Sequence, residues 1–309
     1  FGAVAIGLFV LSVRRLGAHR LIAAAVAISL ATGRLFWENS VFAEVYTLNA
    51  ALWSAALLML LTWRDSGRDR DLYMATAAVA LGAGNHLTIL GLVPGGLALV
   101  LLAGRPWRWR PVVICGLILA AGAAQYAFVW VRTLQHAPFL ESQASNLREL
   151  VEVMTARRYA NIMFRFDVPS LVTERLPLLW RNASGEMGYA AIAAAGLGLL
   201  LLVRRRPATA ALLVLSAGSV LALTANVVAD VGGFLLPVFL MVWLLAGVGL
   251  DALRAAAVRT AGTYAATATL ALVLLLPIGQ LRANYAASDR HTDRFAPRYF
   301  EALFRALPP

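Results

Sequence analysis

The sequence predicts an all-α protein that crosses a membrane many times. Of its 309 residues, 61% are hydrophobic and only 14% are charged, whereas soluble domains carry about 25% charged residues. The mean hydropathy is +0.73, and apolar runs recur along the whole chain. Because backbone N–H and C=O groups in lipid must be paired within their own segment, we expect these runs to be helices.

About ten spans are expected, since a membrane helix needs roughly 20 apolar residues and fewer where it is short or broken. The apolar runs cover residues 1–13, 20–37, 41–63, 72–88, 89–103, 112–131, 187–203, 208–226, 233–250 and 260–278. Residues 72–103 are assigned to two short spans, with Pro94 in the first turn of the second. Residues 1–278 thus form the membrane body, and residues 279–309 are expected to be a polar extracytoplasmic tail.

The basic residues indicate how the spans are oriented. All 27 are arginines, the formal net charge is +11, and the arginines cluster between the apolar runs. The basic connections are "VRRLGAHR", "RDSGRDRD", "GRPWRWRP", "RRRP" and "DALRAAAVR". Placing all of them in the cytoplasm puts every other connection outside, so the arginines mark membrane topology and not a nucleic-acid partner. The lysine-free, alanine-rich composition suggests a bacterial protein of the inner membrane whose active side faces the periplasm.

One long outer connection, residues 132–186, is expected to carry structure of its own. Asn146 and Glu149 occupy the positions of a capping box before an amphipathic helix, and Pro169 is expected to begin a second short helix. Between these helices, basic and aromatic side chains alternate, and they include Arg157, Arg158 and Tyr159. Two interpretations stay open for this stretch: a lid over a lipid-phosphate substrate, or an anchor that lies in the membrane interface.

The candidate site consists of polar and ionisable side chains near the outer ends of the spans. An ionisable group within a span costs about 2.5–3.5 kcal/mol, so it normally faces a cavity or a partner. These residues are Arg34, Glu38, Glu44, Asn85, His86 and Asp230.

Glu44 and His86 are expected to point into the helix bundle. The other positions on the helical stripe of Glu44 are small: Thr47, Ala51, Ser54 and Ala55. His86 follows Gly82 and Ala83 on a second stripe of small residues. Membrane helices pack against each other through such stripes, so both side chains are expected inside the protein.

Most candidates also have a purely structural interpretation. Arg34 and Glu38, four residues apart, could form an ion pair that closes a helix end. His86 could hydrogen-bond a carbonyl where its helix stops, and Asp230 could be an ordinary loop residue. Tyr46, with Asn and Trp neighbours on its face, could join helices through polar contacts.

The blocks "WENSVFAEVYTLNA", "GAGNHLTILGLVPG" and "FLLPVFLMVWLLAGVGL" follow one another along the chain. In these blocks the sequence resembles a protein O-mannosyltransferase-like membrane family, also known as domain of unknown function 2723. The resemblance implies a GT-C type glycosyltransferase: a multi-span helical body with one long extracytoplasmic loop. Such an enzyme takes a sugar from a polyprenyl-phosphate donor and transfers it, with inversion, to a hydroxyl of a secreted or membrane protein.

The same resemblance assigns roles to residues of this chain. Glu44 and Tyr46 match one block of the family, Asn85 and His86 match another, and Asp230 fits an Asp-before-"LP" pattern. Glu44 is then a supporting carboxylate, and the others contribute to substrate binding. The further substrate-binding residues are expected to be Arg34, Glu38, Arg157, Arg158 and Tyr159.

The sequence departs from the family in its first outer loop, which should carry an acidic motif resembling Asp-Ser-Gly-Glu. No predicted outer connection contains it, and the similar "RDSGRD" at 64–69 lies on the predicted cytoplasmic side. The chain starts at Phe1 within hydrophobic sequence, and the topology puts Phe1 outside. We therefore expect an N-terminally truncated chain whose main catalytic acid lies in a preceding loop.

Two other functions remain open from the sequence. A transporter or flippase for a lipid-linked or anionic solute would suit the same cavity, although the matching broken helix expected in its second half is not found. The second open function is that of a non-catalytic protein that binds lipid. No cofactor is predicted: Cys115 is the only cysteine, metal-ligand spacing is absent, and a need for a divalent metal is left open.

Overall fold

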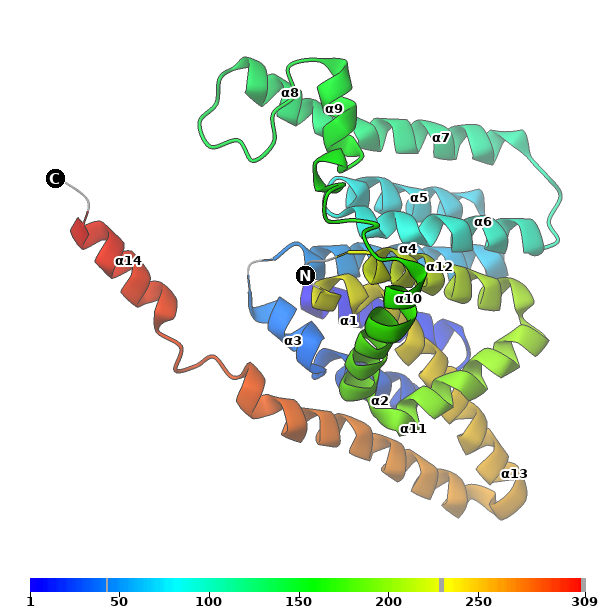
Figure 1. Ribbon diagram of the computed structural model, residues 1–309. Helices are drawn as coiled ribbons and strands as arrows, with labels where there is room; N and C mark the ends of the chain where they lie inside the picture. Colours follow the sequence, from blue (N-terminus) through cyan, green and yellow to red (C-terminus); the bar gives the residue numbers. More distant parts are fainter. Residues whose placement is uncertain (43, 228–230, 307–309) are drawn as a thin grey trace.

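The computed structural model describes residues 1–42, 44–227 and 231–306, and within these ranges its regular structure is helical (Figure 1). The elements, in chain order, are α1 (Gly2–Arg15), α2 (Arg20–Ala31), α3 (Arg34–Val41), α4 (Tyr46–Ser66), α5 (Asp69–Ala83), the 3₁₀ helix η1 (Leu87–Gly91), α6 (Leu92–Leu102), α7 (Trp109–Ala123), η2 (Ala124–Tyr126), α8 (Ala127–Leu134), α9 (Leu147–Met154), η3 (Arg157–Tyr159), α10 (Val168–Ser170), the π-helical turn η4 (Leu171–Arg175), α11 (Leu176–Arg205), α12 (Pro207–Ala225), α13 (Val231–Ser288) and α14 (Phe295–Ala306). The all-α prediction is confirmed.

Each predicted apolar run lies largely on a helix, but the helices differ in length. In the described part of the chain, five helical stretches are long and apolar enough to cross a membrane, or six if α2 and α3, bent by 64°, form one broken span. The stretch Val231–Ser288 has 58 residues and breaks at Gly262, where φ is +76°, so the chain turns back within it (Figure 1). It therefore supplies two of the predicted spans. Helices α1, α5 and α6 are shorter, and their spans stay predictions.

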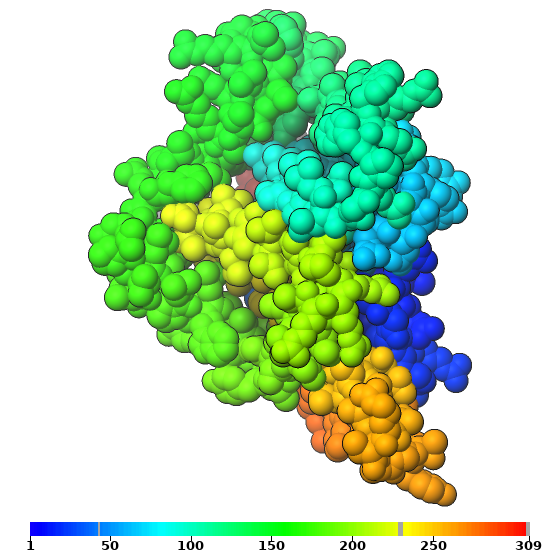
Figure 2. Space-filling model, turned by 90° about the vertical axis from the view of Figure 1, so that its right-hand side faces the viewer, coloured from blue at the N-terminus to red at the C-terminus, as the bar shows by residue number. Residues whose placement is uncertain are grey.

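The basic connections meet on one side of the molecule, which is the side that Figure 2 shows. Their contacts join pairs of connections, and they are Arg15 Nε to Asp65 Oδ2 (3.2 Å), Arg105 to the carbonyl oxygen of Arg64 (3.0 Å), Arg108 to Asp69, and the backbone N–H of His19 to Asp251 Oδ1 (3.1 Å). The contacts of Arg105 and Arg108 require α5 and α6 to run in opposite directions, so the division of residues 72–103 into two helices is confirmed. The alternation of basic and non-basic connections along the sequence thus matches their separation at the two ends of the bundle.

The remaining connections meet at the opposite end. The contacts that join them include Asn85 to the carbonyl oxygen of Val45, the backbone N–H of Phe164 to the carbonyl oxygen of Asn226, Asn284 to the carbonyl oxygen of Thr32, and the guanidinium of Arg290 over the ring of Phe42. By the positive-inside rule this end is expected to face outward, and we call it the outer end. The candidate residues at 34–46 and 85–86 lie on it.

The core is tightest where α11 and α13 cross. A Cβ added at Gly198 would collide with the carbonyl oxygen of Leu245, and one added at Gly249 would collide with that of Ala194. Small residues at such a crossing let two membrane helices approach until their backbones touch. Gly198 and Gly249 lie near the basic connections, and helix α13 also packs against α2, α12 and α3.

The long outer connection agrees with the sequence in its first half. Asn146 Oδ1 accepts the backbone N–H of Glu149 at 3.0 Å, and the Glu149 carboxylate accepts the backbone N–H of Ser145 at 2.7 Å, so the predicted cap at the start of α9 is confirmed. The second predicted helix starts at Val168, with Asp167 as its N-cap and Pro169 in its first turn, so its start is confirmed. It is longer than expected: it continues through η4 and into α11, past Pro177, and breaks at Gly188, where φ is +73°.

The Glu149 cap predicts a dependence of this loop on pH. Hydrogen bonds from the backbone and hydroxyl of Ser145 and from Asn146 lower the pKa of Glu149 in the folded state. The stabilisation is therefore complete above the pKa of the unfolded carboxyl, about 4.3, and is lost as the pH falls through the lower folded value. The protection of backbone amides across residues 145–154, measured as their exchange rate relative to the intrinsic rate at the same pH, should be lower at pH 3 than at pH 6. Glu149→Gln should abolish that difference, and an unchanged difference in this variant would contradict the assignment.

Candidate functional site

Three rings from separate parts of the chain meet at the outer end: Tyr46, His86 and Phe234. The ring centroids of Tyr46 and His86 are 5.2 Å apart, those of His86 and Phe234 5.0 Å, and those of Tyr46 and Phe234 6.1 Å. Tyr46 is the first residue of α4, His86 lies in the turn between α5 and η1, and Phe234 belongs to the first turns of α13. We call this group the ring cluster.

Local structure explains why the rings meet. The backbone N–H groups of Asn85 and His86 donate to the carbonyl oxygen of Gly82 at 2.9 and 2.8 Å, which ends α5 and turns the chain back. Asn85 Nδ2 then donates to the carbonyl oxygen of Val45 at 3.0 Å and fixes this turn to the start of α4. At Gly233, where α13 faces the ring of Tyr46, a Cβ would collide with that ring. The two sequence blocks that carry Tyr46 and His86 are therefore joined directly.

A chain of hydrogen bonds orients the imidazole of His86. Asn49 Nδ2 donates to Thr88 Oγ1 at 2.9 Å, and this hydroxyl lies 2.7 Å from His86 Nδ1. The backbone N–H of Thr88 also points to Nδ1, at 3.4 Å. Because the backbone N–H of Thr88 can only donate, Nδ1 is an acceptor, and the hydroxyl, which accepts from Asn49, donates its own hydrogen to Nδ1. The neutral imidazole consequently carries its hydrogen on Nε2, which makes that atom a hydrogen-bond donor.

Glu44 does not point into the bundle, so its predicted orientation was wrong. The helix-based argument fails because α4 begins at Tyr46 with Val45 as its N-cap, and Glu44 lies before it on the connection from α3. The stripe itself was predicted correctly, since Thr47, Ala51 and Ser54 are all buried. Glu44 is exposed at the outer end, next to the residue whose carbonyl binds Asn85.

Arg34 and Glu38 form the ion pair that their spacing allows, with Nε and Oε1 2.8 Å apart. Both lie on α3, and the Arg34 side chain is 61% exposed while that of Glu38 is 23% exposed. In the described part of the chain, the contacts of these two side chains join Arg34 to Glu38 and do not reach the ring cluster. The structural interpretation of this pair is thus sufficient to explain its geometry.

Glu186 was not singled out from the sequence, yet it is the buried carboxylate at the outer end. Its oxygens accept the backbone N–H of Leu35 at 3.0 and 3.2 Å, at the start of α3. Gln280 donates to its carbonyl oxygen at 2.6 Å. Because the first N–H groups of a helix lack partners within it and carry partial positive charge, this carboxylate caps α3 and joins it to α11 and α13.

Replacing Glu186 should destabilise the outer end. Glu186→Leu removes the acceptor of a buried N–H and is expected to lower the free energy of unfolding by about 1–3 kcal/mol. Glu186→Gln retains an acceptor oxygen and should cost less. Thermal unfolding of the purified protein in one detergent would rank the two variants, with Glu38→Gln as an exposed control expected to change little. Equal stability of Glu186→Leu and the parent protein would exclude the capping role.

Arg157 and Arg158 of the long loop bind carboxylates of the same loop. Arg158 donates to the carbonyl oxygen of Glu141 at 2.7 Å and lies 3.2 Å from its carboxylate, while Arg157 pairs with Glu152 at 3.4 Å. The ring of Tyr159 lies under the guanidinium of Arg158, 4.8 Å away. Among the described residues, no contact joins Arg157, Arg158 or Tyr159 to the ring cluster. Their role near a carrier phosphate therefore stays a prediction.

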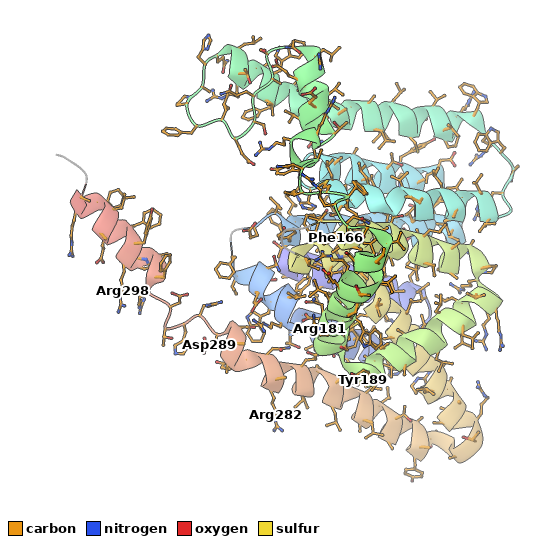
Figure 3. The ribbon with its side chains drawn as sticks, in the orientation of Figure 1. Phe166, Arg181, Tyr189, Arg282, Asp289 and Arg298 are labelled. Atoms are coloured by element: carbon orange, nitrogen blue, oxygen red, sulfur yellow. The ribbon has the colours of Figure 1, made fainter. Side chains whose placement is uncertain are left out.

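Asp230 lies outside the described residues. Sequence reasoning missed Arg175, which is buried and donates to the carbonyl oxygens of Ala225 (2.9 Å) and Val227 (2.6 Å), at the end of α12. Its guanidinium also lies 4.6 Å from the ring centroid of Phe166, which Figure 3 labels. A signal was available: Arg175 and Glu186 are ionisable residues close to an apolar run, as Glu44 is.

The fold defines a class: this is an integral membrane protein with a GT-C fold. Over 93% of the chain its structure matches the crystal structure of ArnT from Cupriavidus metallidurans bound to undecaprenyl phosphate, with a TM-score of 0.55 and 18% sequence identity. The chain spans 58% of that ArnT chain. The GT-C-like architecture expected from the sequence is confirmed.

The sequence itself matches a family model over its first third. Residues 3–110 match the N-terminal domain of the protein O-mannosyl-transferase TMEM260, and this range includes both the "AEVYTL" and the "GNHLTIL" blocks. The resemblance to O-mannosyltransferase-like GT-C proteins is thereby confirmed. No curated protein matches the sequence.

Proposed function

We propose that this chain is the membrane body of a glycosyltransferase that moves a sugar from a polyprenyl-phosphate donor to a hydroxyl of a secreted or membrane protein. One observation carries the proposal: the two blocks within the O-mannosyl-transferase match meet at the outer end through Asn85 and Val45 and through the rings of Tyr46 and His86. The likeness to a protein solved with undecaprenyl phosphate supports the lipid donor. The working side faces the exterior, which in a bacterium is the periplasm.

The proposed reaction is a single displacement. The acceptor oxygen attacks the anomeric carbon, the bond from that carbon to the phosphate oxygen breaks, and the polyprenyl phosphate leaves with the bonding electrons. His86 Nε2–H donates to the donor phosphate, whose charge grows as the bond breaks. Tyr46 and Asn85 shape the adjacent surface. Glu44, exposed beside them, supports the reaction, and the carboxylate that takes the acceptor proton belongs to the acidic loop motif of the family.

The remaining predicted residues are assigned to the edges of the site. Arg34 and Glu38 lie at the outer end as a pair that a substrate can reach, since Arg34 is largely exposed. Arg157, Arg158 and Tyr159 would bind the carrier phosphate only by exchanging their present carboxylate partners for it. Asp230 is the last residue of the proposed substrate-binding set.

A transfer assay on the full-length protein tests the function. The protein is reconstituted in liposomes with a polyprenyl-phosphate donor, whose sugar is radiolabelled, and a Ser/Thr-rich peptide. Labelled peptide is expected only when the protein, the donor and the peptide are all present. Liposomes without protein, and a donor without its sugar, are the controls. Movement of the labelled lipid between leaflets without labelled peptide would instead support a flippase.

A further inference from the structure

Helix α14 has two chemically different faces. One carries large apolar side chains that are all exposed: Phe295 (75%), Tyr299 (54%), Phe300 (51%), Leu303 (39%) and Phe304 (69%). We call it the aromatic face. The opposite side carries Arg298, Glu301 and Arg305, whose charges are directed away from the aromatic face on a helical projection. The expectation of a polar tail was therefore wrong for this segment.

The chain brings the start of α14 to the outer end of the bundle. Before it, Asn284 on α13 donates to the carbonyl oxygen of Thr32 at 2.9 Å, and the guanidinium of Arg290 lies 5.3 Å from the ring centroid of Phe42. These contacts hold the end of α13 against the outer end of the bundle. After a short link, Asp293 accepts the backbone N–H of Phe295 at 2.9 Å, and α14 extends away from the body (Figures 1 and 3).

We propose that α14 lies in the plane of the outer membrane interface, with its aromatic face in the lipid and its charged face in water. At 12 residues it is about 18 Å long, too short to cross a hydrocarbon core of about 30 Å. Aromatic rings beside arginines are typical of helices at this depth. Because the body already spans the membrane, a lipid surface lies where α14 leaves the bundle.

Charge specifies the kind of surface. The segment from Asp289 to Ala306 carries the arginines Arg290, Arg294, Arg298 and Arg305 against the acids Asp289, Asp293 and Glu301. Arg290 and Asp293 pair at 3.7 Å, and Arg305 and Glu301 at 3.8 Å, so Arg294 and Arg298 remain against Asp289, and the segment keeps one excess positive charge with His291 neutral. This charge complements anionic phospholipid headgroups. The proposal is therefore an anionic lipid surface, not a second protein.

Site-directed fluorescence in the reconstituted full chain tests this proposal without any transfer assay. Cys115→Ser provides the background, and single cysteines at Phe304 (aromatic face) and Glu301 (charged face) carry a bimane label. In vesicles with anionic phospholipid, the label at 304 should be quenched severalfold more by doxyl-labelled lipid than the label at 301. Iodide in the water should show the reverse order. Removing the anionic lipid should weaken the contrast.

Two outcomes would overturn the proposal. Equal quenching of both labels by iodide would place α14 in water. Protection of the label at 304 from both quenchers would show that protein covers the aromatic face. Dilution of the protein in lipid then separates a second copy, whose protection is lost, from the body of the same chain, whose protection persists. As a matched control, Phe304→Ser in a Phe300→Cys labelled chain should reduce lipid quenching.

Discussion

Gly198→Leu is expected to push α11 and α13 apart and to lower the unfolding temperature of the protein markedly. A side chain at residue 198 meets the carbonyl of Leu245, which is backbone and cannot move aside as a flexible side chain would. Overpacking commonly costs about 1–3 kcal/mol, and a collision with backbone falls at the upper end of that range. Marginal stability makes such a loss a large fraction of the total. Size-exclusion yield and thermal unfolding in detergent would measure it.

The same helix supplies a matched control for this prediction. Gly196 lies two residues earlier on α11, is exposed, and has no atom within 4 Å of an added Cβ. Gly196→Leu should therefore leave yield and unfolding temperature nearly unchanged, although it adds the same side chain to the same helix. Equal behaviour of the two variants would show that the α11–α13 crossing does not limit stability.

His86→Ala is expected to lower the kcat/KM of sugar transfer by about 10- to 100-fold in the full-length protein. The value follows from the loss of one hydrogen bond to a charged group, about 1.5–3 kcal/mol, at 1.4 kcal/mol per factor of ten. Initial rates in the liposome assay, with the donor concentration varied, would measure it. Full activity of a Glu44→Ala, His86→Ala double variant would overturn the site assignment.

Substitutions behind His86 separate the orientation of the ring from its presence. Thr88→Val removes the hydroxyl between Asn49 and His86 while keeping the shape of the side chain. The imidazole is then free to turn, so the rate should fall less than in His86→Ala, and Thr88→Ser should restore it. If Thr88→Val leaves kcat and its pH profile unchanged, the hydrogen-bond chain is structural only.

Much of the fold was predictable because membrane helices leave strong signals in the sequence. Apolar runs gave the helices, and arginine clusters gave the two ends of the bundle, whose contacts the structure shows directly. The turn at His86 was also predictable from the charge alternation. The ends of the helices were harder to predict. Because α4 starts at Tyr46, two residues beyond Glu44, the Glu44 carboxylate is exposed and not buried as expected.

The site was only partly predictable, since it depends on contacts between distant segments. Tyr46 and His86 were both chosen from the sequence, though not as neighbours, and Phe234 joins them from almost 150 residues beyond His86. Glu186 was passed over because it closes a polar connection just before an apolar run, where a carboxylate needs no explanation. Its importance comes from the unpaired N–H groups of α3, which only the folded chain brings to it.

The contacts between the basic connections have a consequence for biogenesis. The arginines that orient the spans during insertion are, in part, the same residues that later hold the ends of the helices together: Arg15 reaches Asp65, and Arg108 reaches Asp69. A helix inserted in the wrong direction would therefore place its arginines away from these carboxylates. The ion pairs between the basic connections would then not form, so the residues that orient the spans also stabilise the correctly inserted bundle.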